Sequence, residues 1–407
     1  MKGFEYYTLK NGIRVIHQQA AGKVAHLGVV INTGSRDEED GEHGIAHFIE
    51  HVIFKGTHKR KAYHVISRLE DVGGEIDAYT TKEETAIYAS FLKEYYSRSM
   101  ELFADILFNS TFPEKELEKE KEVILDEINS YKDSPAELIF DDFEELIFNG
   151  HPIGRNILGE PDSLKKYKKE NLLNFIGKNY NTDQMVICSV GDVNFSMVIK
   201  WANKYFEGHE ANIRTNRREV LNGYKATVKQ IDKKTYQAHC IIGNRAYAIT
   251  DEKRLPLELV NNILGGPGMN SRLNLALREK HGFTYNIESF YNPYTDTGIF
   301  GIYFGTEQEK VDKSIKIIER ELKLLQNKSL GILQLDRAKK QIIGQMAIGA
   351  ESKSNLMLNI GRSYLLFDKV DPLDVVYEKV NAVTSTQLME VAMEVFDFSK
   401  LSTLIYK

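Results

Sequence analysis

The chain has 407 residues, of which 42% are hydrophobic and 27% charged, and its formal net charge is −5. This composition is typical of globular material with room for two or more cored domains. A mildly acidic chain without long basic runs or apolar stretches of about 18 residues is expected to bind neither nucleic acid nor membrane. No secretion signal is apparent and the two cysteines lie in strand-like runs, so the cytoplasm is the expected location.

The first half of the chain alternates strand-like and helical patterns, beginning with a predicted hairpin around the Asn11-Gly12 turn. Strands are expected at residues 6–9, 13–17, 27–32, 75–80, 85–92 and 184–190. Helices are expected at residues 45–54, 63–72, 95–108, 115–132, from there to 148, at 163–180 and at 196–206.

The second half repeats part of this pattern. Two strand-like runs within residues 288–304 precede a helical stretch at 310–325, as residues 75–92 precede 95–108. We therefore expect an α+β (mixed α/β) protein of two homologous domains, each a mostly antiparallel sheet packed with helices. The expected division is 1–207 for the first domain, 208–222 for a polar linker and 223–407 for the second domain.

The most informative motif is His47-Phe48-Ile49-Glu50-His51, which has the form H-x-x-E-H. Residues four positions apart project from one face of a helix, so both imidazoles could bind one metal ion. Glu50 could then reach a water molecule on that ion without being a ligand itself. Alternatively, the two histidines lie on a charged, partly buried helix face and bind nothing.

A third metal ligand is expected from the charged helix after Pro113. Glu120 and Glu127 are seven positions apart and share a helix face with the apolar Leu117 and Ile124. A carboxylate on an apolar face favours a functional role, whereas the other acidic residues of this helix are explained by solvent exposure.

The chain resembles the inverted-motif zinc peptidases, the family of pitrilysin, insulin-degrading enzyme and mitochondrial processing peptidase, and within it the short, two-domain bacterial type. The motif is followed 76 positions after His51 by Glu127 in the segment EKEVILDEI, and further similarity lies in LKNGIRVI, GGEIDAYTTKEETAIYA, GHPIGRNILG and NSRLNLALREKHGFTYNI. The resemblance covers nearly the whole chain. It implies a zinc metalloendopeptidase with one Zn²⁺ per chain.

The resemblance also implies roles for the site residues. His47, His51 and Glu127 would bind zinc, and Glu50 would be the general base. Glu120 would hydrogen-bond a ligand or the base. The second half would hold no metal, since residues 257–264, the expected counterpart of the motif helix, contain no histidine.

Two further features are expected to contact the substrate. The family's edge strand corresponds to Asp77-Ala78-Tyr79-Thr80, which would bind an extended or unfolded peptide by strand addition. Arg278 and Tyr285 match the family's substrate-contacting pair, with Tyr285 stabilising the oxyanion and Arg278 holding a substrate carbonyl. Without the resemblance, the same residues would be interpreted as an ordinary hairpin strand, a surface arginine and a buried tyrosine.

The resemblance finally implies an assembly. Four homologous domains enclose the family's chamber and this chain supplies two, so we expect a homodimer or a heterodimer with a related chain that lacks the metal motif. Arg278 and Tyr285 would then serve the partner's zinc site. The alternative function is a non-catalytic peptide-binding or structural subunit of a heterodimeric peptidase, although the complete motif argues against it.

Overall fold

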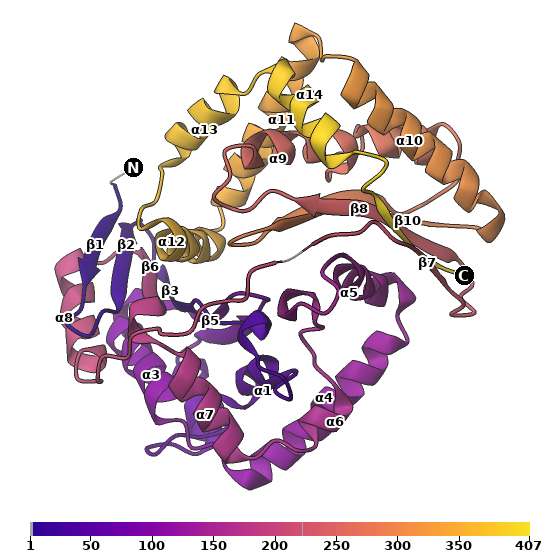
Figure 1. The fold of residues 1–407 in the computed structure, drawn as a ribbon. Helices are drawn as coiled ribbons and strands as arrows, with labels where there is room; N and C mark the ends of the chain where they lie inside the picture. The colour runs from indigo at the N-terminus through magenta and orange to yellow at the C-terminus, as the bar shows by residue number, and fades with distance from the viewer. Residues whose placement is uncertain (1–2, 222) are drawn as a thin grey trace. The chain divides into compact units, whose positions relative to one another are not determined.

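Two mixed sheets organise the chain in a computed structural model, which describes residues 3–221 and 223–407 (Figure 1). The chain forms two compact units, each made of three separate segments. The first unit comprises Met1–Ile128, Asn156–Arg218 and Ile348–Pro372. The second unit comprises Asn129–Arg155, Glu219–Ala347 and Leu373–Lys407.

The first unit contains a six-stranded sheet in the order β1-β2-β6-β3-β5-β4. The strands are β1 (Glu5–Thr8), β2 (Arg14–Gln19), β3 (Val24–Ile31), β4 (Glu75–Thr80), β5 (Thr85–Leu92) and β6 (Met185–Gly191). The β2–β6 pair is parallel, and the other neighbours are antiparallel. Every residue of β6 is buried, which explains its continuous apolar run.

Both faces of this sheet are covered by helices (Figure 1). The helices on one face include α1 (Ile45–Val52), α2 (Ala62–Glu70), α3 (Tyr96–Asn109), α7 (Lys169–Asn179) and α8 (Phe195–Phe206). The start of the long helix α4 (Glu114–Lys132) packs on the same core, and the short helix α6 (Pro161–Leu164) precedes α7. On the opposite face, α12 (Lys353–Phe367) buries Met357 and Ile360 against Val30, Val186 and Cys188.

The second unit repeats the topology of the first. Its sheet has the order β7-β11-β8-β10-β9, with β7 (Val228–Ile231), β8 (Ala238–Ala246), β9 (Ile287–Pro293), β10 (Gly298–Thr306) and β11 (Ser402–Tyr406). In chain order, β7 to β11 correspond to β2 to β6. The one parallel pair among the described strands of this sheet, β7–β11, corresponds to the parallel pair β2–β6 of the first sheet. The predicted α+β fold of two homologous domains is confirmed.

Helices cover both faces of the second sheet as well (Figure 1). One face packs against α9 (Arg254–Gly265), α10 (Val311–Asn327), α11 (Ile332–Ala350) and α14 (Ser385–Val395), with α13 (Leu373–Ala382) contributing Val380. The opposite face packs against α5 (Pro135–Ile147), whose Ile139, Phe143 and Ile147 contact the core around Ile241 and Leu404.

The helices α12, on the first sheet, and α5, on the second sheet, are exchanged between the two sequence halves. In the repeat, α5 of the first half corresponds to α12 of the second, yet α5 packs on the second sheet and α12 on the first. Apolar burial explains this arrangement, because each helix covers a sheet face that would otherwise expose large aliphatic side chains. Each compact unit therefore takes segments from both halves of the sequence, and the expected limits 1–207 and 223–407 stay a prediction for the repeats.

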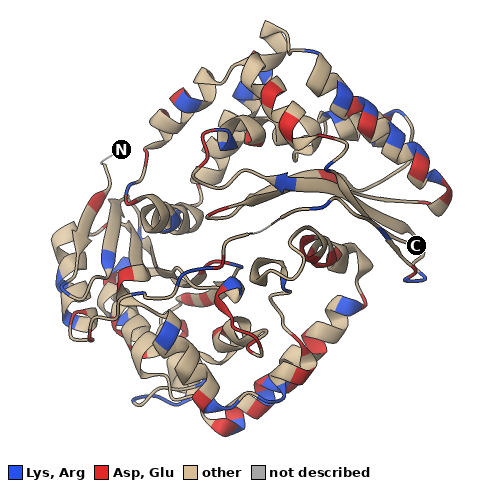
Figure 2. Ribbon diagram, in the orientation of Figure 1, with Lys and Arg blue, Asp and Glu red and all other residues tan. Residues whose placement is uncertain are grey.

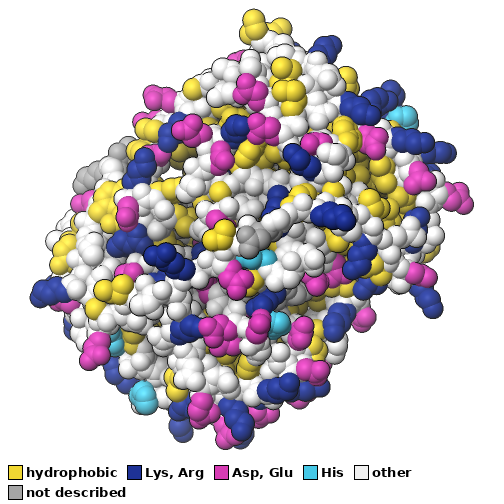
Figure 3. All heavy atoms as spheres, viewed as in Figure 1, with side chains coloured by type: hydrophobic (Ala, Val, Ile, Leu, Met, Phe, Trp, Pro, Cys, Tyr) yellow, Lys and Arg dark blue, Asp and Glu magenta, His cyan; other side chains and the backbone are white. Residues whose placement is uncertain are grey.

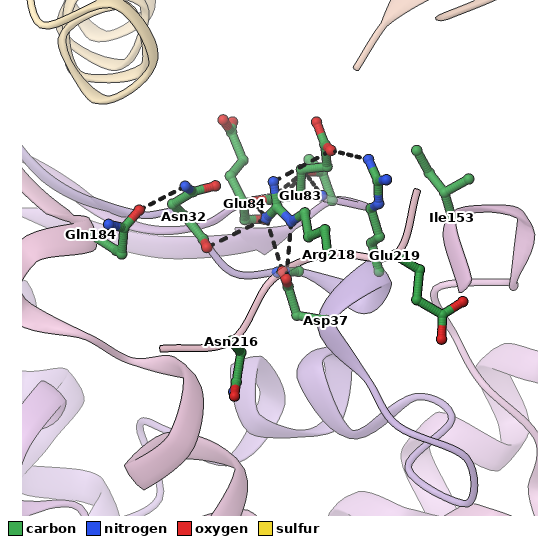
Figure 4. A network of polar contacts seen from close by, with 12 residues as sticks. Asn32, Asp37, Glu83, Glu84, Ile153, Gln184, Asn216, Arg218 and Glu219 are labelled. Carbon is green, nitrogen blue, oxygen red and sulfur yellow. Dashed lines mark hydrogen bonds and ion pairs between the residues drawn. The ribbon is translucent and has the colours of Figure 1, made fainter. Parts of the chain in front are cut away.

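The polar segment expected as a linker is bound to the first unit as far as Arg218. Both Arg218 and Arg214 bond the buried carboxylate of Asp37, and Arg218 Nη2 and Asp37 Oδ2 lie 2.9 Å apart (Figure 4). Arg218 also donates to the Glu83 carbonyl at 2.9 Å. Buried ion pairs of Arg214 and Arg218 thus hold this part of the 208–222 segment.

Charged side chains of both signs are distributed along the helices (Figure 2). On the face shown in Figure 3 they are interspersed rather than segregated by sign. Cys188 and Cys240 are free and buried, as expected from their apolar strands.

Candidate metal centre

The helix that carries the motif, α1, is fixed at its N-terminus by a buried carboxylate. Gly44 precedes the helix with φ = 85°, a left-handed conformation that glycine adopts readily. The Glu38 side chain accepts hydrogen bonds from the backbone N–H groups of Gly44 and Ala46, both at 3.0 Å. The negative charge of the carboxylate also interacts favourably with the positive, N-terminal end of the helix dipole. Glu38 therefore fixes the position of α1.

The helical pitch presents His47 and His51 from the same side of α1. Their rings lie edge to face, with centroids 4.6 Å apart. His47 is buried, at 7% exposure, whereas His51 is partly exposed. The apolar residues of α1, including Phe48 and Ile49, pack into the core and hold this orientation.

The second element of the site is α4, which packs through Leu117, Ile124 and Ile128. The same side of the helix brings Glu120 and Glu127 to the histidines. The Oε2 atom of Glu127 lies 3.8 Å from His47 Nε2 and 3.5 Å from His51 Nε2.

The three side chains have the geometry that a divalent metal needs. One ligand atom each from His47, His51 and Glu127 lies within 4.8 Å of the others. Tetrahedral zinc with bonds of about 2.0–2.2 Å places neighbouring ligand atoms about 3.3–3.6 Å apart, close to the two measured separations. Two imidazoles and a carboxylate are also a donor set that zinc enzymes use. The residues therefore fit a zinc ion.

The protonation of His47 favours this interpretation. Burial, and secondarily the neighbouring His51, lowers the pKa of His47 to about 3, so its imidazole is neutral and has a lone pair available. Its Nδ1 atom is buried without a hydrogen-bond partner among the described residues. The other ring nitrogen, Nε2, faces Glu127 and is the atom available to a metal ion.

His51 is oriented by a second carboxylate. Its Nδ1 lies 3.3 Å from Glu120 Oε2, and the other oxygen of Glu120 bonds the Lys55 ammonium at 2.5 Å. With Nδ1 engaged by Glu120, Nε2 faces Glu127. This arrangement is the carboxylate–histidine support that metal-binding imidazoles generally have.

Glu50 lies between the two histidines in the sequence, and burial raises its pKa, as do the negative charges of Asp77 and Glu127. The Thr80 hydroxyl and His51 oppose that rise. A carboxylate with a raised pKa is a stronger base, which is suited to accepting a proton.

The predicted peptide-binding strand, Asp77 to Thr80, lies in β4 at the sheet edge, where it pairs with β5 alone among the described strands. Asp77 accepts a hydrogen bond from the Tyr88 hydroxyl at 3.0 Å, and Tyr79 donates to Glu84 at 2.9 Å. The helix α1 packs beside β4. The free edge of β4 therefore lies next to the group formed by His47, His51 and Glu127.

Arg278 and Tyr285 belong to the second unit. Arg278 lies on the π-helical turn Asn274–Glu279, with 40% of its side chain exposed and its nearest carboxylate, Glu279, at 3.7 Å. Tyr285 precedes β9 and is 88% exposed. Exposure rules out the alternative that Tyr285 is a buried core residue.

Two contributors to the site were absent from the sequence-based prediction. Glu38 lies eight positions before Ala46, a separation that matches no capping motif. Lys55 follows the motif helix and pairs with Glu120 across 65 positions of sequence. Neither relationship leaves a periodic signal, because both depend on how loops and helices meet in space.

Family comparison agrees with this geometry. Residues 14–161 match the family described as "Insulinase (Peptidase family M16)", and residues 166–342 match "Peptidase M16 inactive domain". The chain belongs to peptidase family M16. The match of residues 166–342 to an inactive domain agrees with the lack of an H-x-x-E-H motif in this part of the sequence.

Similar proteins support the same assignment. The chain is 32% identical over 393 residues to the Bacillus subtilis "Uncharacterized zinc protease YmxG", covering 96% of this chain and 95% of that protein. It is 30% identical over 402 residues to the beta subunit of the mitochondrial-processing peptidase of Dictyostelium discoideum, covering 95% and 84%. The expected enzyme class, a zinc metallopeptidase, is confirmed by the family and these relatives.

Solved structures share the fold along the whole chain. A protease from Helicobacter pylori superposes with a TM-score of 0.90 at 23% identity, covering 100% of both chains. A Pseudomonas fluorescens protein described as a peptidase M16 inactive domain superposes with a TM-score of 0.93 at 20% identity, covering 100% of this chain and 98% of that one. Among the described residues, no helix combines the length and apolarity needed to cross a membrane.

Proposed function

We propose that the M16 peptidase described here is a zinc-dependent endopeptidase that cleaves unfolded or extended peptides, with one Zn²⁺ per chain. The observation that carries the proposal is the convergence of His47, His51 and Glu127, whose ligand atoms lie within 4.8 Å of one another. The cytoplasmic location expected from the sequence stays a prediction.

His47 and His51 would hold the metal through Nε2, and Glu127 through a carboxylate oxygen. Bound zinc supplies Lewis acidity, which lowers the pKa of a water molecule and polarises a carbonyl group. Glu120 keeps the His51 ring in place through Nδ1.

Glu50 is the proposed general base. Its carboxylate takes the proton from the attacking water, holds it, and delivers it to the nitrogen of the leaving amine. The raised pKa of Glu50 supports this role, because the carboxylate must be protonated transiently between the two transfers.

The substrate would lie along β4 as an added strand. Main-chain hydrogen bonds to Asp77, Ala78, Tyr79 and Thr80 hold the backbone of a peptide and demand an extended conformation. This mode of binding selects unfolded segments and excludes residues already paired in a sheet.

Arg278 and Tyr285 are the proposed substrate contacts from the second unit. Tyr285 would donate its hydroxyl hydrogen to the oxyanion, and Arg278 would donate to a substrate carbonyl. We propose that they serve the metal site of a partner chain in a dimer, either a homodimer or a heterodimer with a chain lacking the motif. Relatives named as the beta subunit of a peptidase support the second possibility.

The test is cleavage of a mixed peptide library, read by mass spectrometry, together with zinc analysis of the same samples. Glu50→Gln should keep zinc and lose at least about 100-fold in cleavage rate. The exposed Glu70→Gln, on α2 of the same unit, is the matched control and should behave as the wild type. Cleavage by Glu50→Gln at the rate of the control would refute the assignment of the base.

A further inference from the structure

The second unit contains a cavity of about 490 Å³ that the proposed function does not use. It lies between the loop that joins β7 to β8 and the junction of α4 with α5. The loop supplies Lys233 and Lys234, and the junction supplies Lys132 and Asp133. All of the lining residues belong to this one compact unit. A cavity of this volume suits a small organic molecule.

The charge at the cavity is positive, because three lysines line it against one carboxylate, that of Asp133. The Nζ atom of Lys233 lies 5.3 Å from the centroid of the Tyr406 ring, and no carboxylate of the described residues forms an ion pair with any of the three lysines. Pro135 also lines the cavity and begins α5, so the positive end of that helix dipole adds to the charge of the lysines. The three ammonium groups therefore keep capacity for an anionic ligand.

The loop that carries Lys233 and Lys234 is held by its backbone close to the C-terminus of the chain (Figure 1). The N–H groups of both residues donate to the main-chain oxygen of Lys407, at 2.8 and 3.0 Å, and the N–H of Lys234 also lies 3.0 Å from Asp232 Oδ1. Lys234 has φ = 52°, a left-handed conformation that glycine adopts readily and other residues adopt rarely. Such conformations cluster where ligands are held, so a lysine at this position favours a role for its side chain in binding.

His239 adds a neutral hydrogen-bond donor to the lysines. It lines the cavity and is partly exposed, and its Nδ1 lies 2.9 Å from the Tyr303 hydroxyl. Burial lowers the pKa of His239, so the imidazole is uncharged near neutral pH. When the hydroxyl donates to Nδ1, the ring hydrogen lies on Nε2, which can donate to a ligand. The cavity thus combines three cations with an imidazole N–H group.

We propose that this cavity is an anion site that binds the phosphate group of a small phosphorylated molecule. A phosphate monoester carries a charge of about −1.5 to −2 and has three acceptor oxygens, whereas a carboxylate has a single negative charge and two oxygens. Three ammonium groups and an imidazole N–H match the larger charge and the larger number of acceptors. Tyr236 lines the same cavity with 99% exposure and offers an aromatic face to the organic part of the ligand.

The test measures binding to the full chain by isothermal titration calorimetry, with adenosine 5′-monophosphate, ribose 5-phosphate and adenosine as probes. Adenosine has the base and the sugar of the first probe but no phosphate. Both phosphates should bind at least about tenfold more tightly than adenosine. Their affinities should not change when a chelator is added, because none of the residues that line the cavity is a proposed zinc ligand.

A charge-matched pair of variants assigns the binding to the cavity. Lys132→Gln should weaken binding of both phosphates by at least about fivefold, because it removes one of the three ammonium groups. Lys313→Gln, an exposed position on α10 with the same change in net charge, should leave both affinities intact.

Lys234→Gly separates binding from folding. The substitution removes an ammonium group and places glycine at a left-handed position, which relieves the backbone. The urea midpoint of this variant should therefore equal or exceed that of the wild type, while its affinity for both phosphates falls by at least about fivefold.

The proposal is overturned if either phosphate binds no more tightly than adenosine, or if a chelator abolishes phosphate binding. Equal phosphate affinities of Lys132→Gln and Lys313→Gln, or an affinity of Lys234→Gly unchanged from the wild type, would also overturn it. These results do not depend on peptidase activity, which the library experiment with Glu50→Gln tests separately.

Discussion

His51 Nε2 lies 3.5 Å from Glu127 Oε2, although the two residues are 127 − 51 = 76 positions apart. The contact joins α1 to α4 and completes a set of three atoms that could bind a metal ion within one compact unit. The chemistry proposed for the chain depends on this meeting of two helices.

Replacing Glu127 with glutamine should remove the carboxylate from the metal site. The neutral amide is a weaker ligand, so zinc affinity should fall by at least about tenfold. Titration of the metal-free chain with zinc against a competing chelator measures the affinity. Glu122→Gln, an exposed position on the same helix, is the control. Equal zinc affinities of the two variants would remove Glu127 from the ligand set.

Glu120→Gln should weaken zinc binding without removing a ligand. Replacing the carboxylate with an amide weakens the hydrogen bond to His51 Nδ1 and removes the ion pair with Lys55. Supporting groups of this kind typically contribute 10- to 100-fold in metal affinity or activity, so a loss of about that size is expected. The zinc affinity of this variant is measured by the same titration against a competing chelator. An affinity unchanged from the wild type would show that Glu120 does not orient the His51 ring.

Glu38→Gln should destabilise the start of α1. The carboxylate accepts from the N–H groups of Gly44 and Ala46, and its charge favours the helix N-terminus. The expected cost is about 1–2 kcal/mol, seen as a lower urea midpoint of the metal-free chain by circular dichroism. Glu70→Gln should leave the midpoint unchanged. A midpoint of Glu38→Gln equal to that control would contradict the capping role.

Asp37 predicts a specific pH dependence of stability. Burial alone would raise the pKa of this carboxyl, but the hydrogen bond and charge of Arg218 and the charge of Arg214 together lower the pKa below its ordinary value. A lowered folded-state pKa contributes stability that is present above about pH 3.9, the value for an unfolded aspartate, and is lost as the pH falls through the folded value.

Asp37→Asn should therefore cost about 3–5 kcal/mol at neutral pH, because it leaves two arginines without their buried partner. Urea midpoints measured between pH 2 and pH 7 should show this difference shrinking below about pH 4, as the wild-type carboxyl becomes protonated. Asp71→Asn, an exposed position in the same unit, is the control. A difference that stays constant across the whole pH range would show that the charge of Asp37 is not responsible.

Local patterns predicted much of the fold and the site. The period of the motif segment and the apolar face of 115–132 correctly indicated helices α1 and α4, and the strand-like runs in 288–304 correspond to β9 and β10. The apolar pattern that predicts each of these elements lies within the residues of the element itself. The single helix expected at 163–180 is instead two helices, α6 and α7. Residues 165–168 between them are not helical, and α7 begins at Lys169.

Other features could not be predicted because they depend on partners distant in the sequence. The apolar faces of α5 and α12 indicate burial but not which sheet each helix covers. Asn262 has an ordinary polar side chain in the sequence, and only the folded chain shows that its Oδ1 atom is buried without a partner among the described residues. The run around Cys240 was recognised as strand-like, whereas the strand at 228–231 was not expected, because three of its four residues are exposed and it has no apolar run.

The most direct test of the account is anomalous X-ray scattering at the zinc absorption edge from crystals of the full chain grown with zinc. The account predicts an anomalous peak about 2.0–2.2 Å from His47 Nε2, His51 Nε2 and a Glu127 carboxylate oxygen. Zinc peaks elsewhere in the crystal, with none between these three side chains, would contradict it.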